Sequence, residues 1–360
     1  MSFGLLVPLL FVLLAQGATQ EKPYEERVFV ERVVVNVHVV DNLGSPIPGL
    51  IASDFRVAVD GKPVPLESVE WVPTAGPHPD GARAVAASAP VPAPILSETS
   101  AGTVPPDGDG RLIVVLFQWE IAGQKQEGFV RMQRQAIDFA RSLGLRDRVA
   151  VLLFGSRLWL QQDFTRDRGK VEAALGGILR TAENRARDPD SEVSLADQLT
   201  EEDARSATTI EKALAAVGHA LEPVAGKKSL LLFGWGIGRW SPTFRNELAG
   251  YVRQTSDYVP ARQVLSKAET SVFCLDVSNG AHGLAAGLER VAFDTGGFYV
   301  PTWDFPQFAM RKVERALTGH YVLVFRKPSG PPGRHSIDIR LSGRAGNVFH
   351  RRSYEDGEVP

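Results

Sequence analysis

The segment Gly234-Trp235-Gly236-Ile237-Gly238 is the first candidate for chemistry, because a glycine-rich turn after a strand can bind phosphate. Backbone N–H groups of such a turn point at the anion where a helix begins. The segment lacks the Lys-Ser or Lys-Thr pair of a nucleotide-binding P-loop. It therefore favours a turn that lets Trp235 pack against its neighbours.

Nucleophilic and zinc chemistry have little support. The lone cysteine, Cys274, lies in an apolar run with no neighbour that would activate its thiol, which is typical of a core residue. Phe154-Gly155-Ser156-Arg157 does not match the Gly-x-Ser-x-Gly nucleophile elbow. The histidines show no His-x-x-x-His spacing for zinc. We therefore expect a protein that is not an enzyme.

Three tryptophans, Trp119, Trp235 and Trp240, fall in predicted loops after buried strands. One interpretation is packing within these loops. The other is recognition of a partner, because exposed aromatic clusters are typical of interaction surfaces. The acidic stretch from Arg187 to Asp203 is interpreted as a solvated insertion that could also form the rim of such a surface.

Composition indicates a globular protein without a strong charge. The 360 residues carry 40 Lys and Arg against 42 Asp and Glu, a net charge of −2. Such a balance gives no electrostatic footprint for nucleic acid. One cysteine cannot form an intrachain disulfide, so the core must hold the fold together.

The first residues are typical of a signal peptide. An apolar run from Leu5 to Leu14 precedes Ala15-Gln16-Gly17-Ala18, which supplies the small residues that a signal peptidase requires. About ten apolar residues are too few to span a bilayer core of ~30 Å. We expect residues 1–18 to be removed, the mature chain to have no transmembrane span, and the protein to be secreted or periplasmic.

The remaining sequence predicts a β, α/β, β organisation. Residues 24–72 are rich in β-branched residues and predict an N-terminal β unit, and residues 73–110 are an Ala/Pro/Gly-rich linker or exposed loop. Residues 111–318 alternate unbroken apolar runs with helical patterns, which predicts a doubly wound, three-layer α/β domain with a mainly parallel sheet. One of its helices is expected at 244–259. Residues 319–354 form a C-terminal β segment that either extends this sheet or pairs with the N-terminal unit.

Landmarks in the same order resemble bacterial von Willebrand factor type A (vWA)-related domain proteins, which have a Rossmann-like fold. The resemblance covers about residues 28–354. The matching stretches are 35–50, 54–55, 60–63, 111–117, 147–151, 208–214, 228–233, 292–297 and 321–323.

The resemblance implies a magnesium site that has degenerated in this sequence. The family motif Asp-x-Ser-x-Ser, the metal-ion-dependent adhesion site (MIDAS), is replaced by Gln118-Trp119-Glu120-Ile121-Ala122. Gly234-Trp235-Gly236 stands where the family has Ser-Asp-Gly, and of the expected ligands Thr208, or its neighbour Thr209, remains. Because Mg²⁺ requires hard anionic oxygens, we expect no metal and no cofactor here.

The sequence therefore predicts an exported, non-catalytic protein-interaction or adhesion-type module that is metal-independent. Its partner is expected to be a protein and not a nucleic acid. The alternative is a metal-dependent binding protein or enzyme that uses an altered site around Glu120, Thr208 and Asp276. The predicted binding face, at the degenerate MIDAS loops, comprises Gln118, Trp119, Glu120, Thr208, Trp235 and Trp240.

Overall fold

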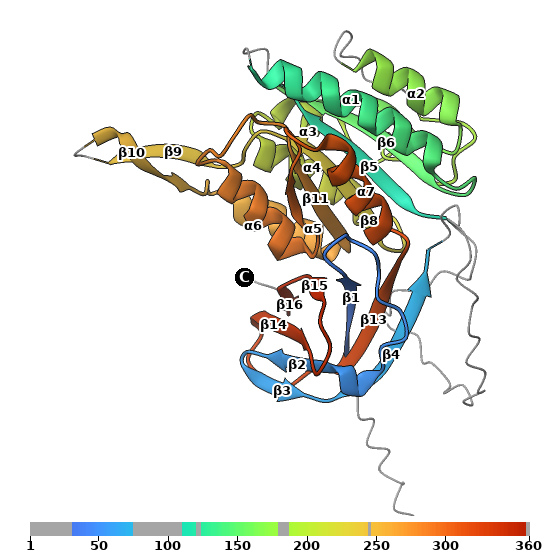
Figure 1. The fold of residues 1–360 in the computed structure, drawn as a ribbon, viewed down its shortest axis with the longest axis vertical. Helices are drawn as coiled ribbons and strands as arrows, with labels where there is room; N and C mark the ends of the chain where they lie inside the picture. Colours follow the sequence, from blue (N-terminus) through green and yellow to red (C-terminus); the bar gives the residue numbers. More distant parts are fainter. Residues whose placement is uncertain (1–30, 75–109, 120–123, 179–186, 244–245, 358–360) are drawn as a thin grey trace, which may run out of the picture. The chain divides into compact units, whose positions relative to one another are not determined.

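A computed structural model describes residues 31–74, 110–119, 124–178, 187–243 and 246–357. For residues 124, 125, 240–243 and 246–252 the backbone alone is described. The predicted signal peptide and most of the predicted linker lie outside the described residues. Residues from Arg32 onward contain two four-stranded antiparallel sheets and one six-stranded sheet with helices, as well as a two-stranded hairpin (Figure 1).

The two four-stranded sheets combine strands from both ends of the chain. The C-terminal β segment pairs with the N-terminal unit, which settles the question that the sequence left open. The first sheet has the order β15 (Asn347–His350), β1 (Arg32–Val40), β13 (Gly319–Arg326), β4 (Leu66–Pro73). The second has the order β16 (Ser353–Asp356), β14 (Gly333–Leu341), β2 (Phe55–Val59), β3 (Lys62–Val64), and the short helix η1 (Ala52–Asp54) precedes β2.

Alternation along β1 explains how the two sheets share a core. Val33, Val35, Val37 and Val39 are buried with side chains of β2, β13 and β14, because every second residue of a strand points to the same face. A tight turn at Asp60 (φ 49°) and Gly61 (φ 75°) joins β2 to β3. Asp-Gly suits this turn, since both residues tolerate positive φ.

The six-stranded sheet confirms the predicted doubly wound, mainly parallel fold. Its strands are parallel apart from β7, which pairs antiparallel with β6. The order is β12 (Tyr299–Pro301), β11 (Thr270–Asp276), β8 (Lys228–Gly234), β5 (Leu112–Gln118), β6 (Arg148–Phe154), β7 (Leu158–Thr165). The strand order reverses between β5 and β8, so the carboxyl ends of these two strands form the topological switch point.

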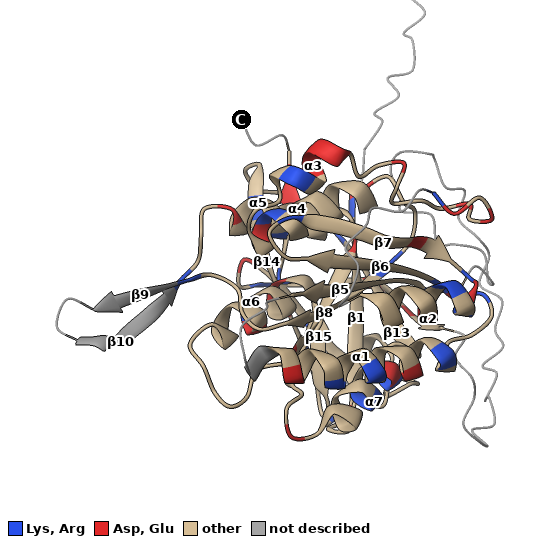
Figure 2. Cartoon of the chain, turned by 90° about the horizontal axis from the view of Figure 1, so that it is seen from above, with Lys and Arg blue, Asp and Glu red and all other residues tan. Residues whose placement is uncertain are grey.

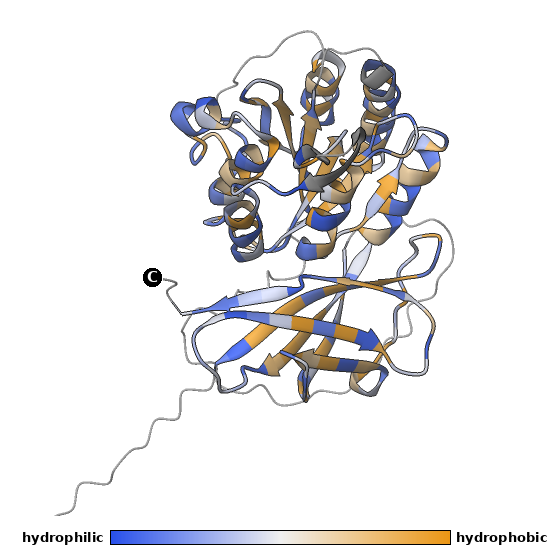
Figure 3. Ribbon diagram, turned by 90° about the vertical axis from the view of Figure 1, so that its left-hand side faces the viewer, coloured by the Kyte–Doolittle hydropathy of each residue, from blue (hydrophilic) through white to orange (hydrophobic). Residues whose placement is uncertain are grey.

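Helices cover both faces of this sheet and make it the middle of three layers. The two four-stranded sheets together form a sandwich. Figure 3 shows hydrophobic residues along the strands of this sandwich and of the parallel sheet. One face packs on α1 (Gln124–Ser142), α2 (Arg168–Gly177) and α7 (Pro306–Ala316). The other packs on α3 (Glu201–Ser206), α4 (Ile210–Leu221), α5 (Tyr258–Lys267) and α6 (Ala285–Thr295).

The predicted helix at 244–259 is wrong. β9 (Arg239–Thr243) and β10 (Asn246–Arg253) form an antiparallel hairpin, and α5 begins only at Tyr258. Pro260, which follows the predicted helix in the sequence, is part of α5. Here it lies in the first turn of α5, where its missing N–H has no intrahelical partner to lose.

Two buried histidines and the half-buried Lys227 join β1 to the six-stranded sheet and its helices. The His38 ring donates from Nδ1 to the Ala316 carbonyl (3.0 Å), which leaves Nε2 to accept from Lys227 Nζ (2.6 Å). The His320 ring lies 5.9 Å from the His38 ring. Desolvation is the main cause of the shifted pKa values. It lowers the pKa of Lys227 to about 7 and the pKa values of His38 and His320 well below the usual value.

A buried ion pair fixes the start of β5. Arg111 donates to the Asp147 carboxylate from its Nε (3.0 Å) and Nη2 (2.5 Å). The backbone N–H groups of Arg111 and Gly144 donate to the same carboxylate (2.9 and 2.8 Å). Each oxygen of Asp147 thus has two donors, as a buried carboxylate requires.

Candidate functional site

Gln118 ties together the two strand ends at the topological switch point. Its side chain is buried at the end of β5, where Oε1 accepts from the Trp235 N–H (3.1 Å) and Nε2 donates to the Gly236 carbonyl (2.8 Å). One amide therefore satisfies a donor and an acceptor of the loop after β8. A carboxylate at this position would have no hydrogen to donate to Gly236.

We expect Gln118→Met to lower the free energy of unfolding by about 2 kcal/mol, because it leaves the N–H of Trp235 and the carbonyl of Gly236 without their partner. Methionine is unbranched and similar in length, so packing changes little. Urea denaturation measures the effect. Gln198→Met, at an exposed position, is the control, and a loss no larger than that of the control would contradict the importance of this clamp.

Trp235 and Trp119 both pack onto the core on the α1 side of the sheet. The two indoles are half-buried against this cluster, and the Trp119 ring lies 5.5 Å from the buried Phe129 ring on α1. The two tryptophans therefore contribute part of their surface to packing and keep part of it at the edge of the sheet.

Asp276 ends β11 with its carboxylate already engaged. Oδ2 accepts from the Tyr299 hydroxyl (2.8 Å) and from His282 Nε2 (2.8 Å), and Oδ1 accepts from the Ser278 N–H (2.9 Å). Burial, with the neighbouring carboxylate, raises the pKa of Tyr299, so the phenol stays a donor. These bonds hold the loop after β11 in place.

Thr208 is exposed and does not join Gln118 and Asp276. Its neighbour Thr209 caps α4, where its hydroxyl accepts from the Lys212 N–H (3.2 Å). Glu211, in the first turn of α4, extends to the loops instead. Its Oε1 accepts from the Gly238 N–H (3.1 Å) and from the Thr255 hydroxyl (3.0 Å), which ties both ends of the β9–β10 hairpin to α4.

The remaining predicted site residues are less completely described. Glu120 lies outside the described residues, as does the side chain of Trp240, whose backbone belongs to β9. Among the described residues, no three His, Cys, Asp or Glu side chains are grouped so that they could hold a metal ion.

Sequence reasoning missed Glu211, His282 and Tyr299 at this edge of the sheet. Thr208-Thr209-Ile210-Glu211 has the spacing of a capping box, which signals a helix start, although the N-cap in the structure is Thr209. The spacing gave no sign that the glutamate contacts Gly238. His282 and Tyr299 lie in segments with no pattern that relates them to Asp276.

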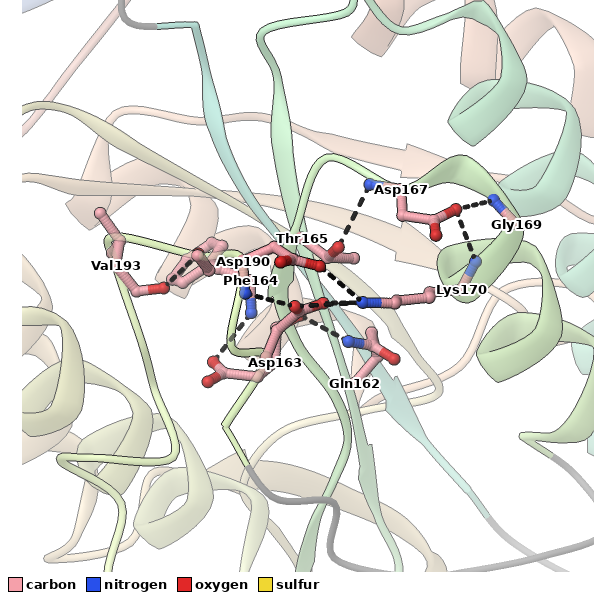
Figure 4. A network of polar contacts seen from close by, with 11 residues as sticks. Gln162, Asp163, Phe164, Thr165, Asp167, Gly169, Lys170, Asp190 and Val193 are labelled. Atoms are coloured by element: carbon pink, nitrogen blue, oxygen red, sulfur yellow. Dashed lines mark hydrogen bonds and ion pairs between the residues drawn. The ribbon is translucent and has the colours of Figure 1, made fainter.

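The acidic insertion, residues 187–203, does not only extend into solvent. Several of its polar groups bind to β7 and α2 (Figure 4). The buried Asp163 accepts from the Leu195 N–H (2.7 Å) and the Ser194 hydroxyl (2.6 Å). Lys170 on α2 forms an ion pair with the buried Asp188 (3.0 Å). The interpretation of this stretch as a solvated loop is therefore wrong for Asp188, although exposed acids such as Glu202 remain on its outer side.

No protein-family model and no curated protein matches this chain. Many solved structures are similar in part, and three of them serve as examples. A point mutant of the PilB minor pilin from Streptococcus sanguinis is 13% identical (TM-score 0.35) and is covered over 62% of its length by 59% of this chain. A von Willebrand factor type A protein from Catenulispora acidiphila is 11% identical (TM-score 0.40; 68% of this chain, 65% of that one). The third is the vWF domain of the type V pili tip protein Mfa5 from Porphyromonas gingivalis, 11% identical (TM-score 0.35; 57% of this chain, 94% of that one).

Two of the three are described as von Willebrand factor domains. This chain spans less than two thirds of the first two proteins. At identities of 11–13% and TM-scores of 0.35–0.40, no residue role passes from these proteins to this chain.

Proposed function

We propose that this chain is an exported, non-catalytic binding module that recognises a protein partner at the carboxyl edge of its parallel sheet without a metal ion. The main support is how the polar side chains at this edge are used. Gln118, Glu211 and Asp276 all hydrogen bond to the loops around them. Side chains engaged in this way hold a surface in shape, and they are poorly placed to act on a substrate.

The loops at this edge suit recognition because the strands beneath them are committed to the core. In open α/β sheets, ligands bind at the carboxyl ends of the strands. Trp119 and Trp235 keep part of their surface there, and a tryptophan near the centre of an interface can contribute more than ~2 kcal/mol.

Export rests on the apolar run at residues 5–14 and the small residues after it. In the ranges that the structure describes, no helix has the length and apolar character needed to cross a membrane.

The proposal is tested by partner capture from the native envelope or culture fluid, with the wild-type chain and a Trp119→Ala/Trp240→Ala double variant. The partner should be retained by the wild type and lost by a folded double variant. Equal retention by both would place the interface elsewhere, for example on the sandwich.

We expect millimolar Mg²⁺, Mn²⁺ or Ca²⁺ to leave the thermal unfolding midpoint unchanged. A ligand that binds only the folded state must raise the midpoint by mass action. The oxygens of Asp276 already accept three hydrogen bonds, so a cation would have to displace them. Differential scanning fluorimetry is the measurement. A rise of several degrees that Glu120→Ala abolishes would favour the alternative, a metal-dependent binding protein or enzyme that uses Glu120, Thr208 and Asp276.

A further inference from the structure

A hollow with a volume of about 640 Å³ lies on the outer face of the second four-stranded sheet, which points away from the sandwich core. Of β14, only Asp338 and Arg340 line this hollow, whereas Ile337 and Ile339 are buried in the core. Ligand pockets commonly have volumes of about 300–1,000 Å³ and carry a few polar groups among apolar ones. The hollow fits this description, because the described residues that line it are apolar or glycine except for Arg56, Asp338 and Arg340.

Two arginines of the hollow stand directly opposite each other, Arg56 on β2 and Arg340 on β14. The backbone N–H of Asp60 donates to the Ser336 carbonyl (3.0 Å), in the same register. Hydrogen-bonded pairs recur at every second residue of an antiparallel ladder, so Arg56 and Arg340 form such a pair, with Cα atoms about 5.5 Å apart. Like charges directly opposite each other destabilise a sheet. The register therefore brings two positive side chains together where their charges repel.

Only one carboxylate lines the hollow, and it is shared. Asp338 forms an ion pair with Nε of Arg340 (2.8 Å) and a second, longer one with Arg352 (3.9 Å). The exposed side chain of Arg56 forms no ion pair or hydrogen bond with any part of the chain that the structure describes. The positive charge at the hollow is therefore not balanced by the residues around it.

The acids on either side of Arg56 along the chain are already engaged. Asp54 accepts from the Ile51 N–H (2.9 Å), and Asp60 accepts from His335 Nδ1 (2.7 Å). On the helices, by contrast, basic and acidic residues lie close together, as Figure 2 shows for α1 and α3. The excess of positive charge is a local feature of this sheet, because the net charge of the whole chain is −2.

We propose that this hollow binds a small ligand whose carboxylate or phosphate group lies between Arg56 and Arg340. Each guanidinium can present two parallel N–H donors to such an oxyanion, and the anion removes the repulsion between the two arginines. Ala58 is paired with Pro63 in the sheet, and both line the hollow. An apolar part of the ligand can therefore lie against these two residues. The site is separate from the carboxyl edge of the parallel sheet and does not depend on the proposed function.

The test is titration of the isotope-labelled full chain, followed by NMR, with phenyl phosphate and with benzoate. These probes carry the two kinds of anion on the same apolar ring, so their affinities show which anion the site prefers. At least one should bind saturably and shift the signals of Arg56 and Arg340. Arg56→Gln and Arg340→Gln should each weaken binding about tenfold or more, since each removes a charged hydrogen-bond donor.

Two controls separate the geometry of the hollow from general attraction. Benzyl alcohol, which has the ring without the anion, should bind at least about tenfold more weakly than the preferred probe. Lys62→Gln removes a positive charge from β3 of the same sheet at an exposed residue that does not line the hollow. This variant should bind the probes like the wild type.

Arg56→Glu gives a second readout, the thermal unfolding midpoint. The glutamate stands opposite Arg340, so the midpoint without ligand should rise as a pair of opposite charges replaces a pair of like charges. The preferred probe should raise the midpoint of the wild type by mass action and leave that of Arg56→Glu unchanged.

Three results would overturn the inference. The first is a set of shifts that do not saturate and that sodium chloride reproduces at equal ionic strength, which would indicate general screening. The second is unchanged affinity in Arg56→Gln and Arg340→Gln. The third is binding of benzyl alcohol as tight as that of the anions. None of these measurements involves Trp119 or Trp240, so the proposed function stands or fails separately.

Discussion

The free energy of unfolding should rise by about 2 kcal/mol between pH 7 and pH 9, because Lys227, half-buried beside His38, has a pKa lowered to about 7 from a usual value of 10.5. In this window the unfolded chain binds more protons than the folded chain. The cost of burying the lysine is therefore fully present below pH 7 and disappears as the pH rises. Lys228, with a pKa lowered to about 8 by burial, adds an effect of the same sign.

Other buried groups limit the pH range over which stability rises, both at its upper and at its lower end. Burial raises the pKa of Cys274, so thiolate formation in the unfolded chain opposes the rise above about pH 8.5. The pKa values of His38 and His320 are lowered, chiefly by burial. Stability should therefore also fall as the pH drops below about 6.5, where unfolded histidines become protonated.

Urea midpoints at pH 7, 8 and 9 measure this dependence for the wild type and for Lys227→Met. The variant should show a clearly smaller rise, although it also loses the hydrogen bond to His38 and its absolute stability can change in either direction. Lys267→Met, at an exposed lysine on α5, should keep the full rise. An unchanged slope in Lys227→Met would mean that Lys227 stays protonated in the folded chain.

Asp147→Asn should cost about 3 kcal/mol of stability, since it removes one charge of a buried pair and leaves the Arg111 guanidinium without a counterion. The asparagine also brings N–H groups against the donors of Arg111 and Gly144. Urea denaturation at pH 7 is the measurement.

Asp138→Asn is the matched control. Asp138 lies 3.5 Å from Arg141 on the surface of α1, where both side chains are 58% exposed. Such a pair contributes at most about 0.5 kcal/mol. A loss below about 1 kcal/mol for Asp147→Asn would show that the Arg111–Asp147 pair and its hydrogen bonds contribute little to stability.

The sequence predicted those strands in which each face has a uniform environment, either apolar or exposed to solvent. β1 alternates because one face lies in the sandwich, and β5, β6, β8 and β11 are unbroken apolar runs because helices cover both faces. β7 escaped prediction for the opposite reason. Its Gln161, Gln162 and Asp163 are polar and yet buried, and Asp163 is satisfied by the 187–203 insertion far along the chain. A pattern of hydropathy cannot show a polar group that a distant segment satisfies.

The candidate site was predictable in position and not in detail. The resemblance placed Gln118, Trp235 and Asp276 at strand ends, and the structure puts them at neighbouring ends of β5, β8 and β11. The pairing of Gln118 with both Trp235 and Gly236 depends on the exact path of the loop. The sequence contains no pattern that predicts the path of this loop.

The interleaved sandwich has a consequence for the order in which the chain folds during synthesis. Val35 on β1 pairs with Leu323 on β13, across nearly the whole described chain. The four N-terminal strands therefore leave the ribosome long before their partners, with their inward valines uncovered. Residues of the α/β part emerge next and can complete their own layers by local crossovers. The sandwich closes last, so a nascent chain stalled before β13 should expose β1 to chaperones or to other strands.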